Sequence, residues 1–440
     1  KRTQALSATP AAVYVITADD IAHATTTLLP ELLRQVPGLQ VARINAHAWA
    51  ITARGFNSAA ADKLEVTMDG RTLYTPLYSG VFWDQQMIPL DQIERIEVMR
   101  GAAGTLWGSN AVNGVINIVS KRAAVSSGLA LSAGEGSGAR ALREARWGGL
   151  ALGGGLRASY MAQTHNSSLA VSQNGAAVDA ADGWDHSRAN LRGDWGEWSL
   201  IGDYSEGREQ GEAADIDLND NSLSLVRSVA ETGGGHTEFQ FYRDQTHRSV
   251  EGGFEERRRT TQLRYERNVL FGESHDVVWG MSYRRSADQT GGSQSLIFTP
   301  ANRTIGLSEV FAQDQWRWST RNSLLYGAKI EHNSFTGIEW QPSLRWLWAN
   351  PGGATAWAAV SRAVRTPNRL DHDARLVGAA NRDPESVSED FDGGAAGELP
   401  TPPVQATEES CLESGGAPAA CALLYDNGVA PANRPRTYEE

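Results

Sequence analysis

The sequence predicts a mainly β fold in which a small N-terminal α+β domain precedes an antiparallel β-barrel with membrane-spanning strands. Two observations support this prediction. Residues 91–121 place a loop rich in glycine and asparagine between two short runs of β-branched and apolar side chains. From about residue 127, segments of roughly ten residues alternate between apolar and polar side chains and are separated by turn residues, a pattern typical of barrel strands in lipid.

Short strands and helices are predicted at the N-terminus. Residues 13–16 predict a strand, and the Thr17 to Asp20 spacing predicts the start of a short helix, because these side chains can cap its first turn. A second helix is expected before Pro37-Gly38, which would end it. Its apolar residues share one face at helical spacing: Leu28, Leu29, Leu32, Leu33 and Val36.

Two turns organise the rest of this domain. Asp69-Gly70 separates two apolar runs and predicts a two-residue hairpin turn. The glycine-rich loop in 91–121 has neither the G-x-G-x-x-G spacing of a dinucleotide loop nor the G-K-[ST] of a phosphate loop. The sequence therefore predicts a strand, a tight loop and a second strand here, with no nucleotide site.

Residues 95–121, RIEVMRGAAGTLWGSNAVNGVINIVSK, closely resemble the signature of the plug domain of TonB-dependent outer-membrane receptors. The departures are Ala102 where the family usually has proline and Trp107 where it usually has tyrosine. Three further segments resemble the family: 32–41, 50–56 and 65–74. The resemblance implies that the following residues are signature positions of the plug: Gly55, Asp69, Gly70, Arg95, Glu97, Gly101, Gly108, Asn110, Gly114 and Asn117.

The resemblance implies a plug domain, residues 1–125, seated inside a transmembrane antiparallel β-barrel that begins at residue 126. Plugged outer-membrane transporters use about 22 strands, whereas residues 127–363 supply only about thirteen alternating segments. Residues 126–440 are therefore expected to form the first part of the barrel, with 371–435 as a long acidic extracellular loop. The chain is expected to be an incomplete receptor that lacks its export signal.

Charge and cysteines characterise the C-terminal segment. Of the net charge of −12, residues 371–440 contribute −10, from 14 acidic and 4 basic residues. A solvated loop is favoured over a cation-attracting vestibule, and no basic footprint for nucleic acid is present. Cys411 and Cys421 predict a disulfide in this exposed segment, with two free thiols as the alternative.

Catalytic and metal-binding patterns are absent from the sequence. The nine histidines are scattered, without H-E-x-x-H or paired Cys/His ligand spacing. The sequence therefore predicts no enzyme, no catalytic residue, no metal site and no cofactor.

The resemblance also implies two groups of site residues. A plug–barrel lock would join Arg54 and Arg100 to Glu439, because guanidinium groups bind carboxylates bidentately. The alternative is that both arginines end strands in solvent. Four aromatic residues are candidates for ligand contact, although packing within the plug or against the barrel wall is slightly favoured for them: Tyr74, Tyr78, Phe82 and Trp83.

The function implied by the resemblance is active uptake of a scarce ligand of the ferric siderophore, haem or cobalamin class. Energy would come through TonB with ExbB and ExbD, across the outer membrane of a Gram-negative bacterium. The expected partners are therefore TonB in the periplasm, outer-membrane lipid and a small-molecule or metal-chelate ligand. A ligand-sensing signalling receptor is one alternative, and a soluble secreted β-rich protein is another.

Overall fold

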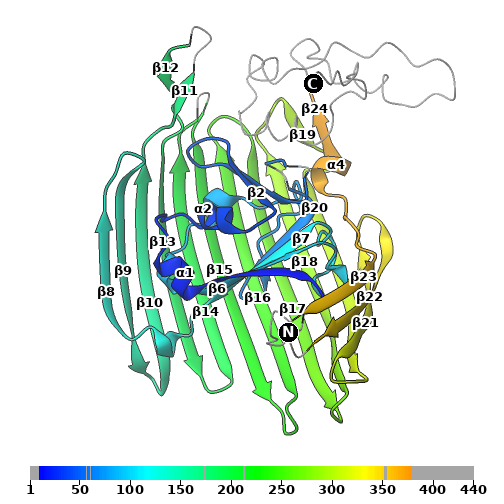
Figure 1. Ribbon diagram of the computed structural model, residues 1–440. Helices are drawn as coiled ribbons and strands as arrows, with labels where there is room; N and C mark the ends of the chain where they lie inside the picture. Colours follow the sequence, from blue (N-terminus) through cyan, green and yellow to red (C-terminus); the bar gives the residue numbers. More distant parts are fainter. Residues whose placement is uncertain are drawn as a thin grey trace, which may run out of the picture.

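The computed structural model describes residues 9–55, 57–59, 61–171, 175–211, 214–350 and 354–377. Two sheets dominate this part of the chain, one of five strands and one of thirteen. The smaller sheet and its helices lie on the concave side of the long curved sheet (Figure 1). This arrangement confirms the predicted mainly β fold with a small α+β plug and a barrel wall.

The plug sheet has the strand order β1-β6-β7-β4-β5. Only β4 and β7 are parallel, and the other neighbours are antiparallel. The strands are β1 (Ala12–Thr17), β4 (Leu64–Met68), β5 (Arg71–Thr72), β6 (Ile93–Arg100) and β7 (Gly114–Ser120). The predicted turn joins β4 to β5, with φ of 49° at Asp69 and 77° at Gly70, values that aspartate and glycine tolerate.

The predicted helices are present but short. Thr17 and Asp20 form a complete capping box at the start of α1 (Ala18–Ala22). The second helix is one turn, α2 (Leu29–Leu32), followed by the 3₁₀ turn η2 (Leu33–Gln35), and its predicted apolar face is buried. A hairpin of β2 (Leu39–Arg43) and β3 (Trp49–Ala53) follows.

Three 3₁₀ turns and a helical turn complete the plug: η3 (Trp83–Gln85), η4 (Leu90–Gln92), η5 (Ala123–Val125) and α3 (Gly104–Trp107). The one-turn helix α3 lies inside the glycine-rich loop and was not predicted. The expected domain boundary after residue 125 falls between β7 and the first strand of the wall.

The wall is an antiparallel sheet of thirteen strands in sequence order, with β8 and β23 at its edges in the described chain. Its first seven strands are β8 (Gly128–Gly134), β9 (Ala139–Ala151), β10 (Gly154–His165), β13 (Trp184–Trp195), β14 (Trp198–Glu209), β15 (Ile216–Ala230) and β16 (His236–Val250). The others are β17 (Glu255–Phe271), β18 (His275–Gly291), β20 (Asn302–Arg317), β21 (Asn322–Asn333), β22 (Gly337–Ala349) and β23 (Thr355–Ser361). The predicted strand number is confirmed.

Side chains of the wall alternate as predicted. Along β18, Trp279, Met281 and Tyr283 are exposed on the convex face. On β21, Lys329 and Glu331 are buried on the concave face, against the plug. An apolar outer face suits lipid, and a polar inner face suits an interface that excludes lipid.

Two small pairs of strands extend the end of the wall that carries the longer connections, at the top of Figure 1. They are β11 (Leu169–Val171) with β12 (Ala177–Asp179), and β19 (Leu296–Phe298) with β24 (Ala374–Leu376). Helix α4 (Arg369–Asp373) precedes β24, so the first residues of the expected acidic loop are ordered against the wall. Longer connections mark the extracellular side of such sheets. None of the described helices has the length and apolarity needed to cross a membrane.

Candidate functional site between plug and barrel wall

Several signature residues stabilise the plug sheet itself. Asp69 accepts two hydrogen bonds from Ser120, at 2.9 Å from its backbone nitrogen and 2.7 Å from its hydroxyl, and so fixes the β4–β5 turn to the end of β7. Asn117 donates to Glu97 at 2.9 Å, and Glu97 also pairs with Arg95 at 2.7 Å. These contacts link neighbouring strands of the sheet.

The glycine-rich loop instead contacts the wall. The backbone N–H of Ser109 donates to Glu331 on β21 at 3.2 Å, and the backbone N–H of Asn110 donates to the Val364 carbonyl at 2.8 Å. At Gly108, where φ is +91°, a β-carbon would lie only 2.5 Å from a carboxylate oxygen of Glu309 on β20. The backbone conformation favours glycine at this position, and a larger residue would also displace the Glu309 side chain.

Ion pairs join the plug to the wall nearer the extracellular end. Arg71 of β5 lies 3.3 Å from Asp244 of β16, and Asp84 of η3 lies 2.6 Å from Arg248 of the same strand. Burial alone would raise the pKa of Asp84, but the guanidinium of Arg248 outweighs it and holds the pKa below its ordinary value. Asp84 is therefore ionised in the interface, and the pair is a specific, charge-assisted contact.

A cavity opens between the plug and the wall at this level. Its plug side includes Arg71, Tyr74, Phe82 and Asn110. Its wall side carries both charge signs: Arg188, Arg258, Arg284, Asp203, Asp220 and Asp244. Charged hydrogen-bonding groups beside three aromatic rings, those of Tyr74, Phe82 and Phe335, suit a polar ligand with some apolar surface.

The four aromatic candidates for ligand contact occupy different environments. Tyr74 and Phe82 line the cavity, and burial raises the pKa of Tyr74 well above its ordinary range, so its phenol stays neutral. Tyr78 packs edge-on against Phe82, with ring centres 4.7 Å apart, and belongs to a cluster with two side chains of β19. Trp83 is 4% exposed and lies in the apolar core of the plug.

The proposed lock is only partly described. Arg54 follows β3 with φ of 62°, and its guanidinium lies against Gly101, directly after Arg100. The Nε of Arg100 is buried without a hydrogen-bond partner among the described residues. Glu439, like Cys411 and Cys421, lies outside the described residues.

No local sequence pattern predicts which charged residues meet across the interface. Asp84 stands in an aromatic run, and its partner Arg248 is one of many arginines on alternating strands. Their contact depends on how the plug sits in the wall, which no local pattern encodes. A weak indication was available, since inward-facing positions of a barrel that holds a plug should carry its polar partners.

Known families match most of the chain. The TonB-dependent Receptor Plug Domain matches residues 5–115, and the family described as TonB dependent receptor-like, beta-barrel matches residues 142–389. A vitamin B12 transporter, BtuB, of Vibrio cholerae is 37% identical over 134 residues, which are 30% of this chain and 21% of that protein. BtuB of Vibrio vulnificus is 32% identical over 139 residues, 31% of this chain and 22% of that protein.

Solved structures share the fold at low sequence identity. The siderophore receptor PirA from Pseudomonas aeruginosa has a TM-score of 0.63 at 20% identity, covering 83% of this chain and 63% of that one. The copper transporter OprC has a TM-score of 0.65 at 14% identity, covering 81% of this chain and 65% of that one. The chain thus spans less than two thirds of these receptors.

The fold and these matches define an outer-membrane receptor of Gram-negative bacteria, with a plug held against a β-barrel wall. The chain belongs to the TonB-dependent receptor family, a family of transporters rather than enzymes. The predicted family, fold class and cellular location are thereby confirmed.

Proposed function

We propose that this protein is an active transport receptor that binds a scarce ligand on the extracellular side and imports it with energy supplied through TonB, ExbB and ExbD. The observation that supports this most is the mixed-charge cavity between the plug and the wall, toward the end with the longer connections. Ligand bound there touches both parts of the molecule. Movement of the plug would therefore change the site.

The ligand class proposed is a ferric siderophore, haem or cobalamin. The names of the similar proteins include a vitamin B12 transporter and a siderophore receptor. Tyr74 and Phe82 are the proposed ligand contacts among the four aromatic candidates, because both line the cavity. Tyr78 and Trp83 support them from the surrounding apolar clusters. Arg54, Arg100 and Glu439 remain the proposed lock between plug and barrel.

Uptake in cells tests the transport function. Cells lacking the gene are starved of iron and offered labelled ferric siderophores, haem and cobalamin, with and without a functional TonB. The proposal predicts that the gene restores uptake of one of these ligands only when TonB is present, while surface binding persists without TonB. Uptake that is unchanged by the gene for every ligand would contradict the proposed ligand class, and uptake that persists without TonB would contradict the energy source.

The cavity is tested by Phe82→Ala in the same cells. Truncation of this ring should weaken binding of the imported ligand, because part of the apolar surface of the site is removed. Phe239→Ala is the matched control, since Phe239 is 49% exposed on the outer face of β16. If Phe82→Ala and Phe239→Ala bind the imported ligand with equal affinity, the cavity is not the ligand site.

A further inference from the structure

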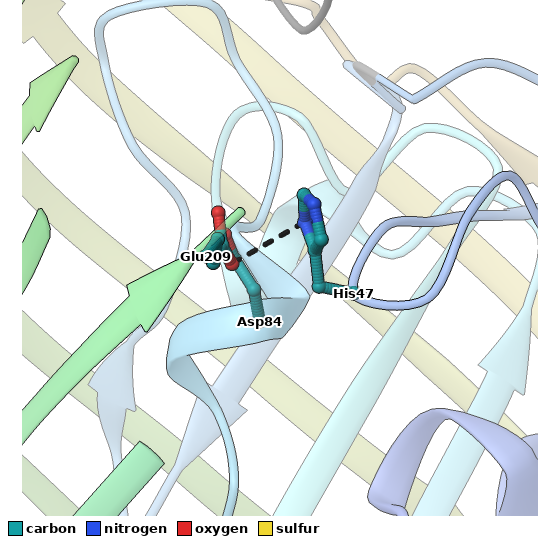
Figure 2. Close-up of side chains that lie close together, drawn as sticks. All are labelled: His47, Asp84 and Glu209. Atoms are coloured by element: carbon teal, nitrogen blue, oxygen red, sulfur yellow. Dashed lines mark ion pairs between the residues drawn. The ribbon is translucent and has the colours of Figure 1, made fainter. Parts of the chain in front are cut away.

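Three side chains able to bind a metal ion meet where the plug contacts the wall: His47, Asp84 and Glu209 (Figure 2). His47 lies in the loop between β2 and β3, Asp84 in η3, and Glu209 at the extracellular end of β14. They are 5%, 8% and 2% exposed. One ligand atom from each lies within 4.8 Å of the other two.

The spacing of His47 and Glu209 fits a metal site. His47 Nδ1 lies 3.4 Å from Glu209 Oε1. Two ligands of a tetrahedral zinc ion, each bound at about 2.0–2.1 Å, are separated by about 3.4 Å. An ion between these two atoms therefore requires little movement of either side chain.

The loop that carries His47 is fixed from both sides. Within the loop, the Asn45 side chain accepts the backbone N–H of His47 at 3.0 Å. From the wall side, Asp182 accepts the backbone N–H of Ala46 at 2.7 Å, and the indole of Trp184 donates to the Ala46 carbonyl at 2.8 Å. The imidazole of His47 is thereby held beside Glu209, and an imidazole nitrogen is a common metal ligand.

Arg248 neutralises only part of the negative charge of Asp84 and Glu209. Its two terminal nitrogens lie 2.6 Å from Asp84 Oδ2 and 3.0 Å from Glu209 Oε2. One guanidinium thus neutralises one of two carboxylates. Glu209 Oε1 has the 3.4 Å contact with His47 Nδ1, which Figure 2 marks with a dashed line, but it accepts no hydrogen bond among the described residues. A buried carboxylate oxygen that accepts no hydrogen bond is costly, and a cation bound between it and His47 would remove that cost.

We propose that His47, Asp84 and Glu209 bind a divalent transition-metal ion of the Zn²⁺ type between plug and wall. Arg248 binds one oxygen of each carboxylate and so orients both ligands, as outer hydrogen bonds do in metal sites. The imidazole nitrogen favours a transition metal over Ca²⁺ or Mg²⁺, which prefer oxygen ligands alone. The bound ion would join the plug to β14.

The sequence predicted no metal site, because these ligands come from three distant segments and form no spacing motif. The proposal is independent of the transported ligand, so its test does not require uptake. A proton shared between Asp84 and Glu209 is the competing explanation for the charge balance. That explanation predicts no tight metal binding.

Metal titration of the purified receptor in detergent tests the proposal. The protein is stripped with chelator, and Zn²⁺ binding is measured by calorimetry, with the visible spectrum of bound Co²⁺ as a second readout. We expect one Zn²⁺ ion to bind tightly to each receptor molecule. His47→Ala and Glu209→Gln should each weaken this binding at least about tenfold and change the Co²⁺ spectrum.

The matched control is His23→Ala, because the His23 side chain is 78% exposed and outside the site. This variant should bind Zn²⁺ with the same affinity as the unchanged protein. Glu209→Gln keeps the volume of the side chain, and circular dichroism of each variant checks that the barrel is folded. The proposal would be overturned if the unchanged protein bound no Zn²⁺ ion tightly. It would also be overturned if His47→Ala and Glu209→Gln, both folded, bound Zn²⁺ as tightly as the unchanged protein.

Discussion

The interior of the plug and its interface with the wall are both buried, but only the interface contains many charged side chains. The plug interior is an apolar cluster that includes Ile96, Ile116 and Ile118, each 0% exposed. The interface adds ion pairs, such as Arg71 with Asp244 and Asp84 with Arg248, to apolar contacts such as that of Tyr78 with β19. Apolar packing stabilises the plug as a unit, whereas the polar contacts fix its position in the wall.

This difference suits a plug that moves without unfolding. Polar groups of an interface can exchange partners with water when they separate, so separation costs less than exposure of an apolar core. Each contact at the interface is nevertheless specific, since a buried charge that loses its partner is strongly destabilising. The first three predictions below concern the free energy of unfolding of the plug in the intact receptor, measured by urea-dependent hydrogen exchange, and the fourth concerns the stability of the wall.

Arg248→Met should have the largest effect. The substitution leaves Asp84 and Glu209 buried without their guanidinium partner, which is expected to destabilise the plug by about 3–5 kcal/mol. Arg243→Met on the same strand is the control, because Arg243 is exposed. If both variants behave alike, the interface pair does not fix the plug.

Ile116→Ala should follow, with a loss of about 3 kcal/mol, because truncation leaves a cavity in the packed core. Ile44→Ala removes the same atoms from a plug residue that is 47% exposed, and a change within about 0.5 kcal/mol is expected there. Comparable losses at the two positions would show that the apolar cluster is not what stabilises the plug.

Asp69→Ala should cost about 2 kcal/mol, since the two hydrogen bonds from Ser120 to the carboxylate are lost. Asp69→Asn keeps one acceptor oxygen and tolerates the positive φ, so a smaller loss is expected. Hydrogen exchange at the end of β7 is the appropriate local readout. An equal loss in both variants would assign the effect to charge rather than to hydrogen bonding.

Arg227→Ala should have the smallest effect, below about 1 kcal/mol. Its pair with Glu197 lies at 3.0 Å, but the two side chains are 44% and 46% exposed. Stability of the wall, measured by thermal unfolding, should hardly change. A loss as large as that of Arg248→Met would mean that burial does not distinguish the two kinds of ion pair.

Local patterns allowed much of the fold to be predicted. The Thr17–Asp20 cap, the Asp69-Gly70 turn and the alternation of the wall strands depend on residues close in sequence, and all three are present. Helix α3 was missed because its four residues include a glycine and lack a capping side chain.

Contacts between plug and wall could not be predicted in the same way. Ser109 meets Glu331, and Asp84 meets Arg248, only because the plug sits in the wall at one particular position. That position depends on shape and on the sum of many polar contacts. For the same reason no metal site was predicted from the sequence, although His47, Asp84 and Glu209 are brought together in the fold.

Native-state hydrogen exchange in increasing urea tests the central claim most directly. It compares the amides of Ser109 and Asn110, which bond to the wall, with those of Ile116 and Ile118 in the plug sheet. The plug should separate from the wall at a lower free energy than it unfolds. The amides of Ser109 and Asn110 should therefore exchange through an opening of lower free energy, while those of Ile116 and Ile118 stay protected. Exchange of all four amides through one opening of equal free energy would contradict a plug that leaves the wall without unfolding.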